Sequence, residues 1–216
     1  MKVSIITITY NSASTVEDTI QSVLSQDYPN IEYIIVDGAS KDNTLQIVEK
    51  YASRIQTVIS EPDKGIYDAM NKGVQAATGD VIGILNSDDF YSDEHVISDV
   101  VEKFRSSSAD AVYADLVYVD RAETSKIIRY WKAGDYKPGL FRRGWMPPHP
   151  TFFVKANAYE RYGLYSLQLK SAADYELMLR FIHKYKVNIA YLSRVITHMR
   201  DGGESNVSFK NRLRAN

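Results

Sequence analysis

Strand and helix signals alternate along about the first ninety residues, and this alternation is the feature that most restricts how the chain can fold. Four apolar segments rich in β-branched residues are typical of buried strands: 3–8, 31–36, 55–59 and 81–85. The segments between and after them are amphipathic and typical of helices: 14–24, 40–51, 66–78 and 93–104. This order predicts an α/β fold with a mostly parallel sheet and helices on both of its faces.

Capping residues and a glycine mark the expected ends of these helices. Ser14 and Glu17 form the Ser-x-x-Glu pattern of a capping box, and Asp93 stands before the fourth helix. Gly79 follows the third helix in the position where glycine commonly ends a helix. We therefore expect helices to open at Ser14 and Asp93 and to stop at Gly79.

The second half of the chain has a different character. Segments 111–119 and 126–131 alternate in the manner of half-exposed antiparallel strands, and 134–150 is rich in Gly and Pro and follows neither period. A further helix is expected over 174–185. Without a repeat or a linker, we interpret 1–216 as one domain with two lobes, 1–110 and a smaller, mixed or antiparallel lobe at 111–216.

Composition excludes some classes of function. The net charge of −1 provides no general attraction to nucleic acid, so no nucleic-acid partner is expected. The chain has no cysteine, which excludes disulfides and thiolate metal sites. Met1 and Lys2 lead straight into a strand pattern rather than a signal peptide, and no apolar run reaches the roughly 20 residues that span a bilayer. We expect a cytoplasmic protein, with peripheral contact to the inner face of the membrane left open.

Polar and acidic residues follow three of the predicted strands where those strands end. Thr9, Tyr10 and Asn11 follow the first, Asp37 ends the second, and Asp88-Asp89 follows the fourth. Open α/β sheets bind ligands beyond the carboxyl ends of their strands, so these side chains should gather at one edge. Clustered carboxylates attract a hard cation, Mg²⁺ or Mn²⁺, and a site with only one or two carboxylates leaves the other positions to a diphosphate. An isolated Asp-Asp pair is also common in turns and helix caps.

Four motifs in the same order resemble a known family. Thr9-Tyr10-Asn11, the segment 37–42, the segment 77–80 and the segment 86–89 are similar to the serial signatures of family 2 glycosyltransferases of the GT-A fold. The resemblance covers roughly residues 1 to 200.

The resemblance implies a Rossmann-like nucleotide-sugar-binding half at 1–110, an acceptor-binding half at 111–216 and an inverting reaction. It implies that Thr9, Tyr10, Asn11 and Asp37 contact the nucleotide, Tyr10 and Asp37 at its base, with Asp88 near the ribose and Asp89 on the metal. A nucleotide-diphosphate sugar, with UDP-sugars favoured, and a saccharide or lipid-linked saccharide acceptor are the implied substrates.

One motif departs from the family pattern. Many members carry Arg before the Asn of the mid-helix motif, where this chain has Met70-Asn71. Lys64 in the preceding loop could take a nucleotide or phosphate role, although a loop lysine is commonly just solvated.

Asp174 is the predicted general base. In the family an Asp before a helix with a Leu-x-x-Arg tail has this role, and Leu177 to Arg180 matches that tail. A base must begin ionised, and a helix N-terminus favours the charged form. Asp174 could instead be an ordinary helix cap, and Glu176 is the alternative base.

Histidines and a basic pair complete the candidate residues. His149, with Trp145 nearby, stands where family members often place a His near the acceptor or leaving group, and His198 could reach the metal or the diphosphate. Each histidine could equally be a structural, hydrogen-bonded residue. His95 and His183 lie in helical patterns and are expected to be scaffold. The pair at 142–143 could meet an anionic lipid-linked acceptor or a membrane surface, or simply be solvated.

Two other functions compete with this interpretation. Sugar-phosphate nucleotidylyltransferases share a similar nucleotide half but begin with a Gly-rich loop, whereas here no glycine precedes Gly38. A non-catalytic sugar- or nucleotide-binding module would be indicated by loss of the metal Asp or the base, and both are present.

Overall fold

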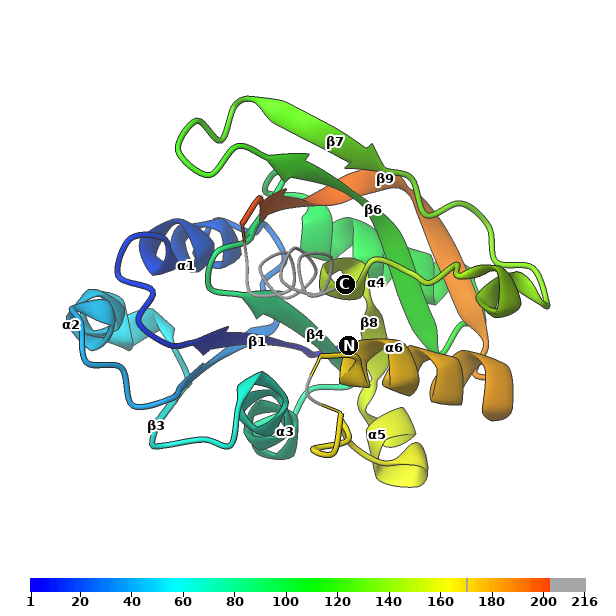
Figure 1. Cartoon of the computed structure of the whole chain (residues 1–216), viewed down its shortest axis with the longest axis horizontal. Coiled ribbons are helices and arrows are strands. Elements are labelled where there is room, and N and C mark those ends of the chain that lie inside the picture. The colour runs from blue at the N-terminus through cyan, green and yellow to red at the C-terminus, as the bar shows by residue number, and fades with distance from the viewer. Residues whose placement is uncertain (170, 203–216) are drawn as a thin grey trace, which may run out of the picture.

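The computed structural model describes residues 1–169 and 171–202, and Figure 1 shows its strands and helices. The strands are β1 (Val3–Thr9), β2 (Ile31–Asp37), β3 (Thr57–Ser60), β4 (Val81–Asn86), β5 (Phe90–Tyr91), β6 (Ala111–Val119), β7 (Ile127–Trp131), β8 (Phe153–Lys155) and β9 (Ile189–Arg200). The α-helices are α1 (Val16–Leu24), α2 (Thr44–Glu49), α3 (Ile66–Ala76), α4 (Val96–Ser106), α5 (Ala156–Tyr162) and α6 (Ala173–Met178). Short helical turns are η1 (Ala52–Arg54), η2 (Leu140–Arg143), η3 (His149–Thr151) and the π-helical η4 (Leu179–Lys184), which continues α6.

The parallel half of the sheet agrees with the sequence prediction. β1 lies between β2 and β4, β3 flanks β2, and all of these neighbours run parallel. Every residue of β1 is buried, because the strand is central and covered on both faces. The register pairs Thr9 with Asp37 and Ile8 with Asn86, so these three strands end at one edge.

The second half extends the same sheet. β8 pairs antiparallel with β4, and β6 joins β8 to β9, giving the order β3-β2-β1-β4-β8-β6-β9-β5 with β7 on the outside of β6. The prediction that the strand at 111–119 is half-exposed is wrong, whereas its antiparallel pairing is confirmed for two of its three neighbours. Every residue of β6 except Tyr118 is buried, and β6 runs parallel to β9 as well as antiparallel to β7 and β8. Side chains on both faces of β6 are packed into the two apolar cores, so the strand is buried although its sequence alternates.

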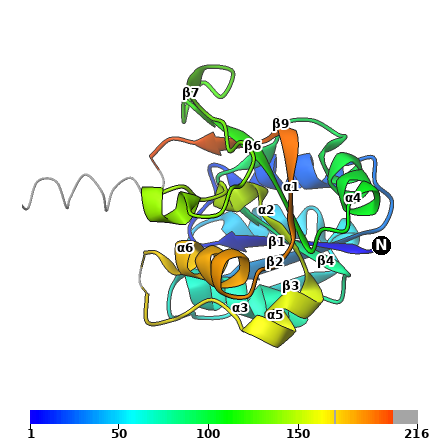
Figure 2. The same cartoon turned by 90° about the vertical axis from the view of Figure 1, so that its right-hand side faces the viewer.

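Helices cover both faces of the sheet, as predicted. One apolar core includes side chains of α1, α2 and α4, and the core on the opposite face includes side chains of α3, α5 and α6. Figure 2 shows the strands between these two helical layers, with β7 standing away from them. None of the helices in the described residues has the length and apolar composition needed to cross a bilayer.

Several predicted helix ends are wrong. α1 begins after Thr15 with no side-chain cap, so the Ser14–Glu17 capping box does not form. The carbonyl of Ser12 instead accepts the N–H groups of Thr15 and Val16. α4 begins at Val96, and the carboxylate of Asp93 accepts the N–H of His95 over 3.0 Å in the turn before it.

Gly79 does not end α3 in a left-handed conformation. The helix finishes at Ala76, and Ala77 is already extended. A Cβ on Gly79 would lie 2.8 Å from the backbone N of Ser4, so glycine is required here by the close approach of the chain to β1.

Candidate active site

Three buried polar atoms at the carboxyl ends of β1 and β4 have no hydrogen-bond partner within the described residues. They are Thr9 Oγ1, Asn86 Oδ1 and Asp89 Oδ1. Buried polar atoms are normally paired, so an unpaired group of this kind indicates a place prepared for a ligand, an ion or water. Because β1 and β4 are neighbours, this polar edge coincides with the binding position expected for an open parallel sheet.

Asp89 is the most constrained of these residues. Its side chain is fully buried, its backbone N–H bonds the carbonyl of Asn86 at 3.0 Å, and its carbonyl accepts the hydroxyl of Thr19 at 2.7 Å. Oδ2 lies 3.4 Å from Asn86 Nδ2. Burial, and then the neighbouring charge of Asp88, raise the pKa of Asp89 well above its usual value. A carboxylate in this position favours a bound cation or proton as compensation.

The side chain of Asp88 is partly exposed and has different contacts from that of buried Asp89. Its carboxylate keeps 26% of its surface exposed and lies 3.8 Å from Nη1 of Arg121, which comes from the turn between β6 and β7. Its backbone carbonyl accepts a 2.8 Å hydrogen bond from Arg200, a buried residue that also pairs with Asp18. Sequence reasoning missed both arginines, because no motif links the β6–β7 turn or the end of β9 to the Asp-Asp pair.

Asp37 is not an unpaired carboxylate, which corrects the expected cluster of three. It is fully buried, and Oδ2 accepts the N–H of Ser40 at 3.0 Å and the hydroxyl of Ser60 at 2.8 Å. The hydroxyl of Ser40 bonds the other oxygen. Asp37 therefore organises the loop after β2. Within the described residues, no three His, Cys, Asp or Glu side chains are grouped to hold a metal ion by themselves.

The loop after β1 exposes Tyr10. Asn11 adopts a left-handed backbone conformation with φ of 49°, which Asn tolerates better than most residues. It is held there by two 2.8 Å bonds, from its N–H to the hydroxyl of Ser40 and from the N–H of Lys41 to its side-chain oxygen. Tyr10 is consequently 59% exposed at the edge of the sheet. Lys64 is also exposed, in the loop before α3.

Asp174 lies among aromatic and imidazole groups. Tyr67 on α3 donates a hydrogen bond to Asp174 Oδ1 over 3.0 Å, and Nδ1 of His149 lies 3.6 Å from Oδ2. The helix cap is Ala172, and Asp174 is in the first turn of α6, so the interpretation of Asp174 as an N-cap is wrong. The sequence did not indicate a role for Tyr67, because its local pattern predicts only a helix.

The alternative base is already engaged. Glu176 forms a bidentate pair with Arg180, at 2.8 Å from Nε and 3.0 Å from Nη2. Arg180 also donates to the carbonyls of Gly163 and Leu164, at 3.0 and 2.7 Å. Glu176 therefore holds Arg180, which contacts the preceding loop, and is less available than Asp174 for proton transfer.

His149 connects the two parts of the site. Its Nε2 lies 3.5 Å from Asn86 Nδ2, and the same nitrogen of Asn86 approaches Asp89. Burial lowers the pKa of His149, against the opposing charges of Asp174 and Asp88, although 23% of its side chain remains exposed. His149 is accordingly neutral near pH 7, with one ring nitrogen able to donate and one able to accept.

Two further predicted site residues, Trp145 and His198, contact other protein side chains. Trp145 donates from Nε1 to the carbonyl of Ala133 at 2.8 Å and its ring contacts those of Tyr113, Tyr136 and Phe141. His198 on β9 meets the ring of Phe90 edge-on at 5.0 Å, and burial lowers its pKa.

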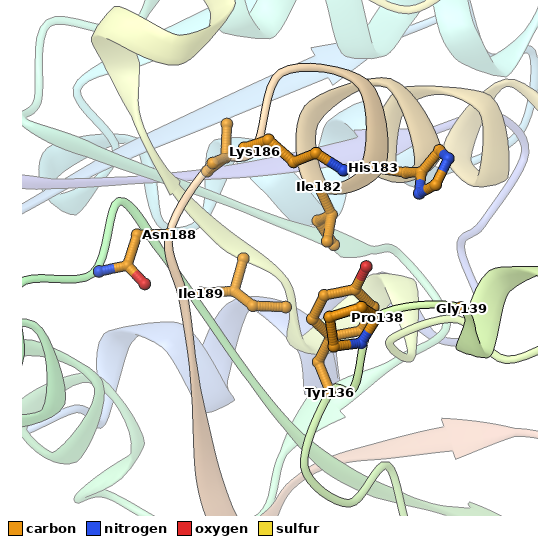
Figure 3. A pocket seen from close by; sticks show the side chains of 9 residues that line it. Tyr136, Pro138, Gly139, Ile182, His183, Lys186, Asn188 and Ile189 are labelled. Carbon is orange, nitrogen blue, oxygen red and sulfur yellow. The ribbon is translucent and has the colours of Figure 1, made fainter.

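The remaining two histidines differ from each other. His95, expected within a helix, is the exposed residue before α4 and lies 2.6 Å from Asp27. His183 on η4 borders a hollow of about 280 Å³ beneath the loop at 136–139. Figure 3 shows Ile182 and Ile189 pointing toward Tyr136 and Pro138 in that hollow, which contains none of the predicted site residues.

Fold and site together define an α/β protein whose candidate ligand site lies at the carboxyl ends of parallel strands. The family model described as Glycosyl transferase family 2 matches residues 4–164. The chain belongs to this family. It is 29% identical over 207 residues to the PGL/p-HBAD biosynthesis glycosyltransferase Rv2957 of Mycobacterium tuberculosis, covering 94% of this chain and 78% of that protein. An uncharacterized glycosyltransferase of the same organism, Rv1514c, is 31% identical, with 82% and 68% covered.

Solved structures share the fold. Staphylococcus aureus TarS, crystallised as residues 1–349 with UDP-GlcNAc, aligns with a TM-score of 0.76 and 22% identity over 96% of this chain and 61% of that one. The mannosyltransferase PcManGT of Pyrobaculum calidifontis, in complex with GDP-Man and Mn²⁺, aligns with a TM-score of 0.73 and 19% identity over 98% and 60%. The chain thus has the expected GT-A-like fold and spans about three fifths of the length of these structures.

Proposed function

We propose that this chain transfers a sugar from a nucleotide-diphosphate sugar, in the first place a UDP-sugar, to a hydroxyl of a saccharide or lipid-linked saccharide, with inversion at the sugar carbon. One observation carries the proposal: His149 lies between Asp174, at 3.6 Å, and Asn86, at 3.5 Å, and Asn86 in turn approaches buried Asp89. A candidate base and a candidate diphosphate site therefore adjoin, as a single displacement requires. The nucleotide sugars in the titles of the TarS and PcManGT structures support the donor class.

In the proposed reaction Asp174 takes the acceptor proton. The acceptor oxygen forms a bond to the anomeric carbon while the bond from that carbon to the diphosphate breaks, and the electron pair leaves with the diphosphate. The hydrogen bond from Tyr67 holds Oδ1 of Asp174 and leaves Oδ2 toward His149. This arrangement orients one carboxylate oxygen for proton transfer.

The donor set at Asp89 fits a divalent metal, Mn²⁺ or Mg²⁺, that takes most of its ligands from the substrate. A buried carboxylate with an unpaired oxygen is suited to one bond to a hard cation, and the described residues supply no complete cage. When bound, such an ion would neutralise charge on the leaving diphosphate. Arg121, beside Asp88, would add positive charge at the same edge.

The donor can be identified by thermal-shift measurements on a panel of nucleotide sugars, with and without Mn²⁺. A true donor raises the melting temperature by mass action and does so only weakly without metal. Product formation with simple hydroxyl acceptors then separates an enzyme from a non-catalytic binding module. Family membership favours sugar transfer over the nucleotidylyltransferase alternative.

A further inference from the structure

β7 is an unusually exposed strand. Among the described strands it pairs only with β6, and it projects from the body of the molecule (Figure 2). Three of its large apolar side chains face solvent: Ile127 is 59% exposed, Ile128 49% and Tyr130 52%. An exposed, apolar edge strand is a liability in solution, so a surface of this kind commonly has a partner.

The same segment is cationic. Residues 126–132 contain Lys126, Arg129 and Lys132 and no acidic residue, and none of the three cations forms an ion pair with a described residue. Arg129 lies over the rings of Tyr118 and Trp131, at 4.9 and 5.5 Å from their centroids. Its charge therefore remains available at the surface. Asp120 and Glu123 are the acidic residues of the hairpin turn, and Asp115 on β6 is buried and accepts hydrogen bonds from Tyr130 and the N–H of Ala133.

Charge and geometry together select the partner. Pairing of β7 with β7 of a second copy would bring three cations on each strand together, which is repulsive. The ladder between β6 and β7 is irregular at this point, because Tyr118 pairs with Arg129 whereas Val119 pairs with Ile127. Such a bulge makes β7 a poor template for one added protein strand. A lipid surface needs no strand register to cover exposed apolar side chains. Tyr, Trp, Lys and Arg are the residues that favour the boundary between headgroups and acyl chains.

We propose that β7 docks onto an anionic lipid surface. Ile127 and Ile128 enter the headgroup boundary, and the cations of Lys126, Arg129 and Lys132 contact lipid phosphates. This surface differs from the basic pair at 142–143, which the sequence suggested for membrane contact. Arg121 in the adjoining turn lies 3.8 Å from Asp88, so docking would hold the active-site edge close to the membrane.

Co-sedimentation of the full chain with vesicles tests the proposal. Vesicles of phosphatidylcholine alone are compared with vesicles that also contain phosphatidylglycerol, at low and at high salt. We expect binding to the anionic vesicles only, weakened by salt. The double variant Ile127→Ser/Ile128→Ser should lower the partition coefficient by about tenfold or more, because little apolar surface is left to insert. Lys126→Gln/Arg129→Gln/Lys132→Gln should lower it to a similar degree.

Matched controls lie elsewhere on the surface. Val58→Ser changes a 44% exposed residue on the opposite edge strand, β3, and Arg142→Gln/Arg143→Gln removes the other basic pair. Both should bind vesicles like the unchanged protein. Circular dichroism reports on the fold and UDP binding reports on the donor site. The spectrum and the UDP affinity should be the same in all variants.

Several outcomes would overturn the proposal. Failure of the unchanged chain to bind anionic vesicles would do so, as would loss of binding in the 142–143 variant with retention in the β7 variants. Capture of a soluble acidic protein through β7 in place of vesicles would assign the strand to a protein partner. Vesicle binding does not require sugar transfer, so its failure and that of the proposed reaction are separate results.

Discussion

Tyr67 donates a hydrogen bond to Asp174 Oδ1 over 3.0 Å, and this contact joins α3 in the first half of the chain to α6 in the second. Burial, and then the negative charge of Asp174, raise the pKa of Tyr67 above its usual value. The phenol therefore keeps its proton at neutral pH and acts as the donor. Tyr67 is a positioning residue for the proposed base.

Tyr67→Phe should lower kcat for sugar transfer by about tenfold or more, the range for a lost hydrogen bond to a charged group. The donor Kd should stay the same, because the ring and its stacking on Tyr165 at 5.9 Å remain. Steady-state kinetics and nucleotide titration measure the two effects. Tyr185→Phe, at a ring that stacks on Tyr162, is the matched control and should alter neither. An unchanged kcat in Tyr67→Phe would exclude the positioning role.

Asp174→Asn should abolish transfer while leaving donor binding near normal. The amide preserves shape but cannot accept the proton, and general-base catalysis contributes about 10² to 10⁴ in rate. Product assays with saturating donor, together with a thermal shift by UDP, distinguish the two effects. Normal turnover in this variant would move the base to another residue.

Glu176→Gln should lower the stability of the protein and leave kcat for sugar transfer nearly unchanged. Loss of the carboxylate leaves the guanidinium of Arg180, 15% exposed, without its ion-pair partner. We expect a loss of about 1–2 kcal/mol in the free energy of unfolding, measured by urea titration. Asp110→Asn, which breaks the more exposed pair with Lys155, should cost less than about 1 kcal/mol. A large fall in kcat with unchanged stability would instead indicate Glu176 as the base.

Asp89→Ala should remove metal-dependent donor binding, and Asp89→Asn should do so without creating a cavity. In the absence of metal, the Asn variant should be more stable by about 1 kcal/mol or more, because it does not bury a charge. The sign follows from the raised pKa of Asp89: stability present at low pH is lost as pH rises through that pKa. Melting curves at pH 5 and pH 8, with and without Mn²⁺ and UDP, test both points. Retained Mn²⁺ dependence in either variant would contradict the assignment.

Glu32 should make the stability of the protein depend on pH in the acid range. Burial opposes its ionisation, but hydrogen bonds from Lys2, Ser4 and Thr78 prevail and lower its pKa from 4.5 to about 2. The stabilisation is present above pH 4.5 and is lost as pH falls toward 2, with a size on the order of 3 kcal/mol. Glu32→Gln should flatten the pH dependence of unfolding in that window. Thermal melts from pH 2 to 6 would disprove this contribution if both proteins lost stability equally.

The helices and strands of the first half could be predicted because their signals are local. The burial of β1 and the placement of Asp89 after β4 follow from β-branched runs and strand ends, which need no knowledge of distant residues. Helix ends were less accurate. Gly79 looked like a helix stop, whereas its role is set by Ser4, which is remote in sequence.

The sequence by itself determined the parallel core and the acidic residues at the strand ends, because hydrophobic periodicity encodes which side of each element is buried. Only the tertiary structure decided what those residues touch. Ser40 in the loop after β2 and Ser60 at the end of β3 pair Asp37 through three contacts, whereas Asp89 keeps an unpaired oxygen. Tyr67 reaches Asp174 across the two halves. Hydrogen bonds and burial depend on which distant segments meet, and no local pattern records that.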